Sequence, residues 1–534
     1  MTGSIETMAF ILAVLVLVAV IAQRLTLPPS ILLVMAGIGL ALVPGLPALE
    51  LAPELVILVL LPPLIYSAGV AMSWREFCQN LRPITLLAFG AVVFTTVAVA
   101  AAMHYLLHWP WPVAFVLGAI VSPPDVVAPL SIARRLGLPR RLLVVLEGEG
   151  LANDATALIL YKFAVLAVTA GSISAGKAAG NFALIVAGEV LYGIGVGWLS
   201  LRLRHWAREP RVEITLSVMT PFLAYLIPHQ VGGSGVLATV ACGLYVSWNG
   251  PRLISAATRL QGIFFWDLII YLIEGFVFLI TGLQARSLIE KAHDFPIGQV
   301  LTATAVTVVI VILARFAWVF PVTYGTRWLN PVLARREPSP PWRWVFVLSF
   351  VGIRGVVSLA AALAIPLWVD GGNPFPHRDL ILFATFGVII VTLIGQGLML
   401  PNVIRWLGLR GDGEADARLE RQAELDARTA AVSHARTHLK RIAEERGLSE
   451  EIVTFLNARH DQRERLIPSD LDDGLTAMRA NNDVRLELIS AERDFLYGLL
   501  RGGTITDESR RRLERELDLE EAAILAKREG ETPL

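Results

Sequence analysis

The stretch that decides the fold is GAIVSPPDVVAPL, residues 118–130, in which two prolines and an aspartate interrupt a long apolar run. Pro123 and Pro124 have no backbone N–H to donate and cannot continue an α-helix. Asp125 follows them at the centre of a segment of membrane-spanning length. Backbone groups freed at that depth are tolerated only where they are buried in protein or line a cavity. The stretch therefore predicts a discontinuous membrane helix with a polar site at its break.

Apolar segments recur on both sides of this stretch. The chain has 534 residues, 55% of them hydrophobic, with a mean hydropathy of +0.60, which is too apolar for an ordinary soluble protein. Counting segments of about 20 residues gives about thirteen predicted spans. The sequence thus predicts an all-α, polytopic membrane protein. The predicted spans are residues 5–23, 29–46, 52–72, 83–107, 111–131, 142–170, 176–201, 212–229, 233–249, 260–284, 296–325, 342–367 and 379–408.

The charges of the predicted loops give an orientation. Alternate loops carry nearly all the loop arginines, whereas the other set carries only Lys177, Arg286, Lys291 and Arg378. Because cytoplasmic loops are enriched in Lys and Arg, we expect the N-terminus outside the cell, the C-terminus in the cytoplasm, and the protein in the inner membrane.

After Gly408 the composition changes to a dense mixture of both charges with helical spacing of Leu, Ile and Ala. We therefore expect a transmembrane domain over residues 1–410 and a cytoplasmic helical domain over residues 411–534. Gly502 and Gly503 are expected to separate two helices of this tail. Dimer support, pH regulation and partner docking are equally consistent with its composition.

Several function classes have no support in the sequence. The 46 basic and 46 acidic residues balance, so no nucleic-acid partner is expected. Cys78 and Cys242 are the only cysteines and indicate neither a disulfide framework nor a thiolate metal site. No P-loop, nucleophile elbow or HExxH motif is present, so we expect neither an enzyme nor a cofactor.

The sixth predicted span begins with EGEGLANDATALILYKFAV, residues 147–165. An ionisable residue inside a membrane costs about 3 kcal/mol or more, and this segment holds several. Glu149 and Asp154 diverge by about 140° around a helix, so they need different partners. Asp154 lies deeper, next to Asn153, and burial favours its neutral form, so that one carboxylate can carry either a proton or a cation. That competition is the chemistry of an antiporter.

Positive charges come from the second half of the membrane region. Arg315 and Arg354 each lie in an apolar span, and buried arginines demand acidic partners. Gly352 and Gly355 flank Arg354 and loosen its helix. Each half of the region thus supplies a broken or weakened span with a charge, the arrangement expected of inverted repeats with two discontinuous crossing helices.

At these motifs the chain resembles the bacterial sodium/proton exchangers related to the animal plasma-membrane exchangers, over essentially all residues up to about 410. Five features match in order. They are Asp125 in a proline-interrupted crossing helix, residues 149–154 for the ESLxND pattern, Arg315 for the VAR arginine, Arg354 for the RG arginine, and Gln396 with Gly397 for the closing QG.

The resemblance implies a site and a mechanism. It makes Asp154 the shared site of proton and cation, assisted by Asp125, and it pairs Glu149 with Arg315 structurally. Asn153 implies electroneutral exchange, and the family implies a homodimer with elevator-type alternating access. The expected substrates are H⁺ and a monovalent cation, most simply Na⁺. The candidate ion-binding residues are Asp154, Asn153, Asp125, Ser122 and Gly150, with the two aspartates as the acidic ligands of the cation.

Two residues depart from the family pattern. Gly150 stands where the family's ligating serine usually lies, and Ser67 stands where a glutamate often pairs with the RG arginine. We hypothesise that Glu274, which lies inside the tenth span, replaces that partner of Arg354. The choice between Na⁺ and K⁺ or Li⁺ stays open, as does the alternative of a non-transporting membrane sensor of pH or ions.

Overall fold

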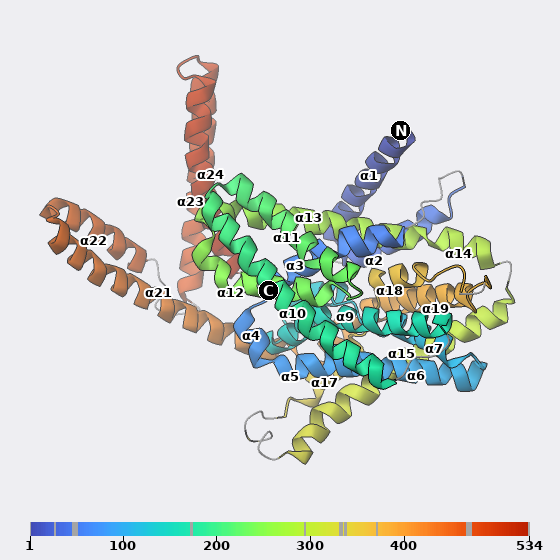
Figure 1. The fold of residues 1–534 in the computed structure, drawn as a ribbon. Coiled ribbons are helices and arrows are strands. Elements are labelled where there is room, and N and C mark those ends of the chain that lie inside the picture. The colour runs from blue at the N-terminus through green and yellow to red at the C-terminus, as the bar shows by residue number, and fades with distance from the viewer. Residues whose placement is uncertain are drawn as a thin grey trace. The chain divides into compact units, whose positions relative to one another are not determined.

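The computed structural model describes residues 2–25, 28–44, 52–170, 175–292, 295–330, 335, 339–369, 372–465 and 473–531, and these are mostly helical (Figure 1). The one β-type contact among them is an isolated bridge between Trp368 and Pro374. The chain forms two compact units, Met1–Leu409 and Arg410–Leu534. The all-α prediction is confirmed.

The first unit contains all the apolar segments that the sequence predicts as spans. Its helices, of which η1, η2 and η3 are π-helical, are α1 (Thr2–Leu25), α2 (Pro29–Ala41), η1 (Leu55–Leu60), α3 (Leu61–Ala71), α4 (Trp74–Gln79), α5 (Leu81–Thr85), η2 (Leu86–Ala91), α6 (Val92–Leu107), α7 (Trp111–Val121), α8 (Val127–Arg135), α9 (Arg140–Ala170), α10 (Ala175–Ala207), α11 (Pro210–Gln230), α12 (Val236–Leu253), α13 (Ala256–Leu283), α14 (Ala285–Ala292), α15 (Ile297–Leu329), α17 (Trp342–Phe350), α18 (Val356–Leu363), α19 (Arg378–Ile390), η3 (Val391–Gln396) and α20 (Gly397–Leu407).

Each predicted span coincides with a helix or a broken helix to within several residues. By length and composition, 7 helical segments among the described residues could each cross a membrane. Two predicted spans are interrupted: α7 and α8 are separated by residues 122–126, and α17 and α18 by residues 351–355. The discontinuous crossing helices are therefore confirmed.

The helices of this unit pack mostly within two groups. One group contains α6, α7, α9, α15 and α17–α19, and the other contains α1–α3 and α10–α13. Small residues allow the closest crossings: a Cβ added to Gly193 of α10 would lie 2.0 Å from the carbonyl oxygen of Ala238 in α12. The two groups meet where α9 contacts α3 and α12 and where α18 contacts α13. The ion-site residues that the sequence predicts thus lie mainly on the first group.

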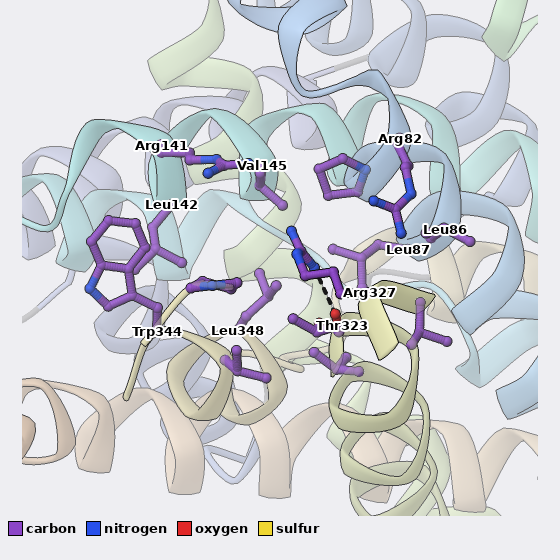
Figure 2. A pocket seen from close by; sticks show the side chains of 15 residues that line it. Arg82, Leu86, Leu87, Arg141, Leu142, Val145, Thr323, Arg327, Trp344 and Leu348 are labelled. Atoms are coloured by element: carbon purple, nitrogen blue, oxygen red, sulfur yellow. Dashed lines mark hydrogen bonds between the residues drawn. The ribbon is translucent and has the colours of Figure 1, made fainter. Parts of the chain in front are cut away.

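The ends of α5, α9, α15 and α17 enclose a cavity whose rim carries Arg82, Arg141 and Arg327 (Figure 2). Arg82 and Arg141 lie near the N-terminal ends of their helices, whereas Arg327 lies near the C-terminal end of α15. All four helix ends thus belong to one end of the helix bundle, where the alternation of loop charges predicts the cytoplasmic surface.

The second unit consists of α21 (Arg410–Arg446), α22 (Glu450–Arg465), α23 (Asp473–Arg501) and α24 (Asp507–Glu531). α21 packs on α22, and α23 packs on α24. Ion pairs between side chains join α23 to α24, for example Arg485 with Glu520 at 2.5 Å. α23 ends before Gly502 and Gly503, and the φ of 71° at Gly503 suits glycine.

Candidate ion site at the crossing of two broken helices

The two interrupted helices meet at their unwound segments. The backbone N–H of Asp125, between α7 and α8, donates to the carbonyl oxygen of Ile353, between α17 and α18, at 2.7 Å. Both segments lack regular helical hydrogen bonds, so their peptide groups are available to side chains and ions. The crossing therefore gathers backbone oxygens at the centre of the unit, as the proline pair and the two glycines predict.

Arg354 lies in the second unwound segment and is 1% exposed. Its Nε donates to the carbonyl oxygen of Val121 at 2.9 Å and its Nη2 to that of Ser122 at 3.4 Å. Its backbone N–H donates to Oγ1 of Thr392 at 3.0 Å. The guanidinium thus occupies the C-terminal end of the half-helix α7, where unsatisfied carbonyls favour a cation.

The structure corrects the hypothesis that Glu274 pairs with Arg354. Within the described residues no ion pair joins these two side chains, because backbone carbonyls freed by the helix break accept the hydrogen bonds of Arg354. Glu274 lies on α13, and its side chain makes no hydrogen bond or ion pair within the described residues. Rescue of Glu274→Gln by Arg354→Gln is therefore not expected.

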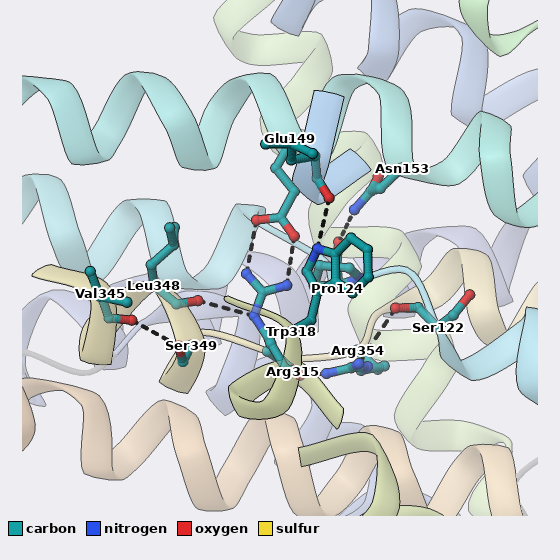
Figure 3. A network of polar contacts seen from close by, with 12 residues as sticks. Ser122, Pro124, Glu149, Asn153, Arg315, Trp318, Val345, Leu348, Ser349 and Arg354 are labelled. Atoms are coloured by element: carbon teal, nitrogen blue, oxygen red, sulfur yellow. Dashed lines mark hydrogen bonds and ion pairs between the residues drawn. The ribbon is translucent and has the colours of Figure 1, made fainter. Parts of the chain in front are cut away.

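Glu149 and Arg315 form a bidentate ion pair that joins α9 to α15 (Figure 3). Arg315 Nη1 lies 2.6 Å from Glu149 Oε1, and Nη2 lies 2.8 Å from Oε2. The side chain of Arg315 is 3% exposed, and that of Glu149 is 0% exposed. Nε of Arg315 also donates to the carbonyl oxygen of Leu348 in α17 at 3.0 Å. One buried pair therefore fixes three helices around the crossing.

Asn153 and Asp154 lie on α9 beside the first unwound segment. Asn153 Nδ2 donates to the carbonyl oxygen of Pro124 at 2.6 Å (Figure 3), while its Oδ1 is buried and makes no hydrogen bond within the described part of the chain. Asp154 follows Asn153 on α9, and Asp125 follows Pro124 in the unwound segment, so the hydrogen bond between Asn153 and Pro124 joins the two stretches that carry these carboxyl groups. Carboxylate and amide oxygens are ligand types that suit a hard cation.

The remaining predicted site residues contribute differently. The hydroxyl of Ser122 donates to the carbonyl oxygen of Ala119 at 3.0 Å, and the carbonyl of Ser122 accepts from Arg354. Gly150 offers no side-chain oxygen, and a Cβ there would lie 2.2 Å from Cγ2 of Val126. Oδ1 of Asp125 accepts from the N–H of Val127 at 2.9 Å, which holds the carboxylate at the start of α8. No cluster of three or more His, Cys, Asp or Glu side chains occurs among the described residues, so neutral oxygens would have to complete a cation site.

Sequence reasoning missed two buried polar groups in the second group of helices. Tyr225 of α11 is fully buried, and its hydroxyl has no hydrogen-bond partner in the described residues. Glu189 of α10 is buried and accepts from the backbone N–H groups of Gly235 and Leu237 at 3.0 and 3.1 Å, at the N-terminus of α12. A single tyrosine or glutamate in an apolar span is the signal that could have identified them.

Gly355 is expected to be essential at the crossing. A Cβ at this position would lie 2.2 Å from Oδ2 of Asp125, so Gly355→Ala must displace the carboxylate. Overpacking of this kind costs about 1–3 kcal/mol, and we expect transport to fall about tenfold or more. Ion flux in proteoliposomes measures the effect. Gly39→Ala is the matched control because its added Cβ has no heavy atom within 4 Å, and equal flux in the two variants would contradict the prediction.

Comparison with known proteins supplies the family. The family described as sodium/hydrogen exchanger, transmembrane, matches residues 10–406. A Na⁺/H⁺ exchanger of Mycobacterium tuberculosis H37Rv, itself described as uncharacterized, is 36% identical over 98% of this chain and 96% of its own. A sodium, potassium, lithium and rubidium/H⁺ antiporter of Bacillus pumilus is 35% identical over 74% of this chain and 61% of its own.

A solved structure shares the fold. The sodium proton antiporter MjNhaP1 of Methanocaldococcus jannaschii at pH 8 has a TM-score of 0.61 and 17% identity, over 76% of this chain and 99% of that one. The relatives are named as transporters, in agreement with the expectation of a carrier rather than an enzyme. By the extent of the family match and of the relatives' identity, this chain belongs to the sodium/hydrogen exchanger family of membrane proteins.

Proposed function

We propose that this protein exchanges Na⁺ for H⁺ across the inner membrane by competitive binding at Asp154. The observation that carries the proposal is the hydrogen bond from Asn153, the neighbour of Asp154 on α9, to the carbonyl of Pro124, the neighbour of Asp125 at the crossing of the two broken helices. Oδ1 of Asn153 lacks a donor among the described residues. A carboxylate in that setting binds either a proton or a small cation, and release of one allows entry of the other.

The charges around the site support one-for-one exchange. Glu149 is neutralised by Arg315, and Arg354 is held by backbone carbonyls, so neither is the group that exchanges its proton for a cation. Asn153 is neutral beside Asp154. If Asp154 alone exchanges one proton for one monovalent cation, transport is electroneutral. An imposed membrane potential would then leave the transport rate unchanged.

The packing of the unit supports an elevator mechanism. The group containing α7, α9, α15 and α17–α19 carries the candidate site and would move against the group containing α10–α13. The second group would hold the contact of a homodimer. In this proposal the N-terminus lies outside the cell and the residues from Arg410 onward form a cytoplasmic domain, as the loop arginines indicate.

K⁺ is the second candidate cation. Gly150 provides no hydroxyl, so the site has fewer side-chain oxygens than the family pattern supplies. Because ligand number and cavity size set the selectivity between cations, this change keeps K⁺ beside Na⁺ as a candidate. The name of the Bacillus pumilus relative includes potassium, lithium and rubidium beside sodium, which favours testing all of them.

Restoring the missing hydroxyl is expected to change ion preference. Gly150→Ser alone would bring Cβ within 2.2 Å of Cγ2 of Val126, so we expect impaired transport. Gly150→Ser with Val126→Ala removes the contacts with both methyl groups, leaves Cβ of residue 126 at 3.1 Å, and adds an oxygen, which should change the ratio of Na⁺ to K⁺ flux about tenfold. The ratio of Na⁺-dependent to K⁺-dependent flux measures this preference. Gly188→Ser is the control, because a Cβ added at Gly188 has no heavy atom within 4 Å. An unchanged ratio in an active double variant would contradict a ligand role for this position.

The proposed function is tested with purified protein in proteoliposomes that carry an imposed pH gradient and a pH-sensitive dye. Addition of Na⁺, K⁺, Li⁺ or choline in turn should dissipate the gradient for the transported ions and leave it intact for choline. If K⁺ dissipates the gradient at least as strongly as Na⁺ does, K⁺ would take the place of Na⁺ as the proposed substrate. No response to any cation would overturn the antiport proposal and favour a membrane sensor.

A further inference from the structure

A lysine in the membrane unit joins the two groups of helices. Lys162 is half-buried and lies on α9, in the group that carries the candidate ion site. Its Nζ donates to the carbonyl oxygen of Gly233, in the turn at residues 231–235 between α11 and α12 of the other group. A charged group within an apolar span is costly, and the ion site does not account for this one. The hydrogen bond therefore needs an explanation of its own.

The acceptor of this hydrogen bond is held by its own group. Glu189 of α10 is 3% exposed. Its carboxylate accepts from three backbone N–H groups at the start of α12, those of Ser234, Gly235 and Leu237. The turn packs tightly on this carboxylate, because a Cβ added to Gly233 would lie 2.5 Å from Oε1 of Glu189. The carbonyl oxygen of Gly233 is therefore positioned by α10 and not by the lysine that it meets.

The contact lies beyond the ion site along α9. Lys162 follows Asp154 by eight residues, which corresponds to about 12 Å along a helix. The opposite end of α9 begins with Arg140 and Arg141, on the side that the loop charges assign to the cytoplasm. By that assignment, the hydrogen bond between Lys162 and Gly233 lies on the outer side of Asp154, at the boundary between the two groups.

We propose that the hydrogen bond between Lys162 and Gly233 is a latch that closes the ion site toward the outside. This inference rests on the proposed function, in which the group containing α9 moves against the group containing α10–α13. Such a movement separates Lys162 from Gly233, so the bond forms in only one of the two access states. A hydrogen bond from a charged donor favours the state that contains it by about tenfold or more.

The latch gives Lys162 a role that differs from that of the ion-site residues. Lys162 is a positioning residue, because its ammonium group contacts the second group of helices and does not hold the transported cation. It determines how often the site opens to the outside. Loss of the ammonium group should therefore shift the protein toward the outward-open state.

The test measures the access of a thiol reagent to the outer side of the ion site. Leu158 lies one turn before Lys162 on the same face of α9 and is 7% exposed. Leu158→Cys is combined with Cys78→Ser and Cys242→Ala, so that a membrane-impermeant reagent added to intact cells reports on this position alone. Lys162→Met is expected to raise the labelling rate about tenfold. Lys162→Arg keeps a charged donor and should restore most of the slow labelling.

A second variant disturbs the acceptor and keeps the lysine. The Cβ of Gly233→Ala would collide with the carboxylate of Glu189 and displace the turn, so this variant should also raise the labelling rate. It decides the question if Lys162→Met does not fold. Gly195→Ala is the matched control, because its added Cβ has no heavy atom within 4 Å. Tyr192→Phe removes a hydrogen bond of 3.0 Å to the carbonyl of Leu223 within the second group and should leave labelling unchanged.

Three outcomes would overturn the latch. The first is an unchanged labelling rate in folded Lys162→Met, and the second is an equal rise in Tyr192→Phe, which would indicate general loosening. The third is a rise seen only when the reagent is applied from the cytoplasmic side, in inverted vesicles. Flux is a separate readout: absence of cation-dependent flux in the unmodified protein overturns the proposed exchange, whereas normal flux with unchanged labelling in Lys162→Met overturns the latch alone.

Discussion

Asp154→Asn is expected to abolish cation-dependent proton flux while leaving the protein folded. The asparagine keeps the size of the side chain but can carry neither a proton nor a cation's counter-charge at this position. Among the described residues Asp154 accepts no structural hydrogen bond, so little of the fold depends on its charge. We expect the initial rate of gradient dissipation to fall by about two orders of magnitude or more, with an unchanged melting temperature.

The matched control is Asp267→Asn, which removes an exposed carboxylate from α13. Its flux should equal that of the unmodified protein. Residual cation-dependent flux in Asp154→Asn would show that another group carries the ion, and Asp125, which lies at the crossing of the two broken helices, would be the next candidate. Loss of flux in both variants would indicate damage from any change of charge rather than a special role of Asp154.

The break in the helix at residues 122–126 could be predicted because it is a local property of the chain. Pro123 and Pro124 remove two donors, and no tertiary contact can replace a missing N–H. The position of Glu149 and Asp154 on one long apolar helix followed in the same way from spacing along the chain. The Glu149–Arg315 partnership did not follow from spacing, since 166 residues separate the two, and only the resemblance to a family implied it.

The partners of Arg354 could not be predicted, because they exist only once two distant helices cross. A sequence shows a buried guanidinium and predicts an acidic partner, but the carbonyls of Val121 and Ser122 are free only where α7 ends. The π-helical segments were also invisible to a periodicity of 3.6 residues. For example, η3 carries Thr392, whose hydroxyl accepts from the backbone of Arg354.

The Glu149–Arg315 pair is expected to be the most sensitive polar contact of the membrane unit. Glu149→Gln leaves a buried guanidinium without its counter-charge, and Arg315→Gln leaves a buried carboxylate. Removing one partner of a buried pair costs about 3–5 kcal/mol, so either variant should unfold at a much lower temperature in detergent. The double variant Glu149→Gln/Arg315→Gln buries no charge and should lose less stability than the sum of the two single variants.

An exposed pair in the same unit provides the comparison. Arg286 and Glu290 lie 3.3 Å apart with side chains 29% and 65% exposed, so Glu290→Gln should cost less than about 1 kcal/mol. The difference between the two pairs tests whether burial, rather than charge alone, makes Glu149 structural. If Glu149→Gln were as stable as Glu290→Gln and lost only transport, Glu149 would belong to the ion path. The assignment of the exchanging proton to Asp154 alone would then fail, because a second carboxylate would titrate beside it.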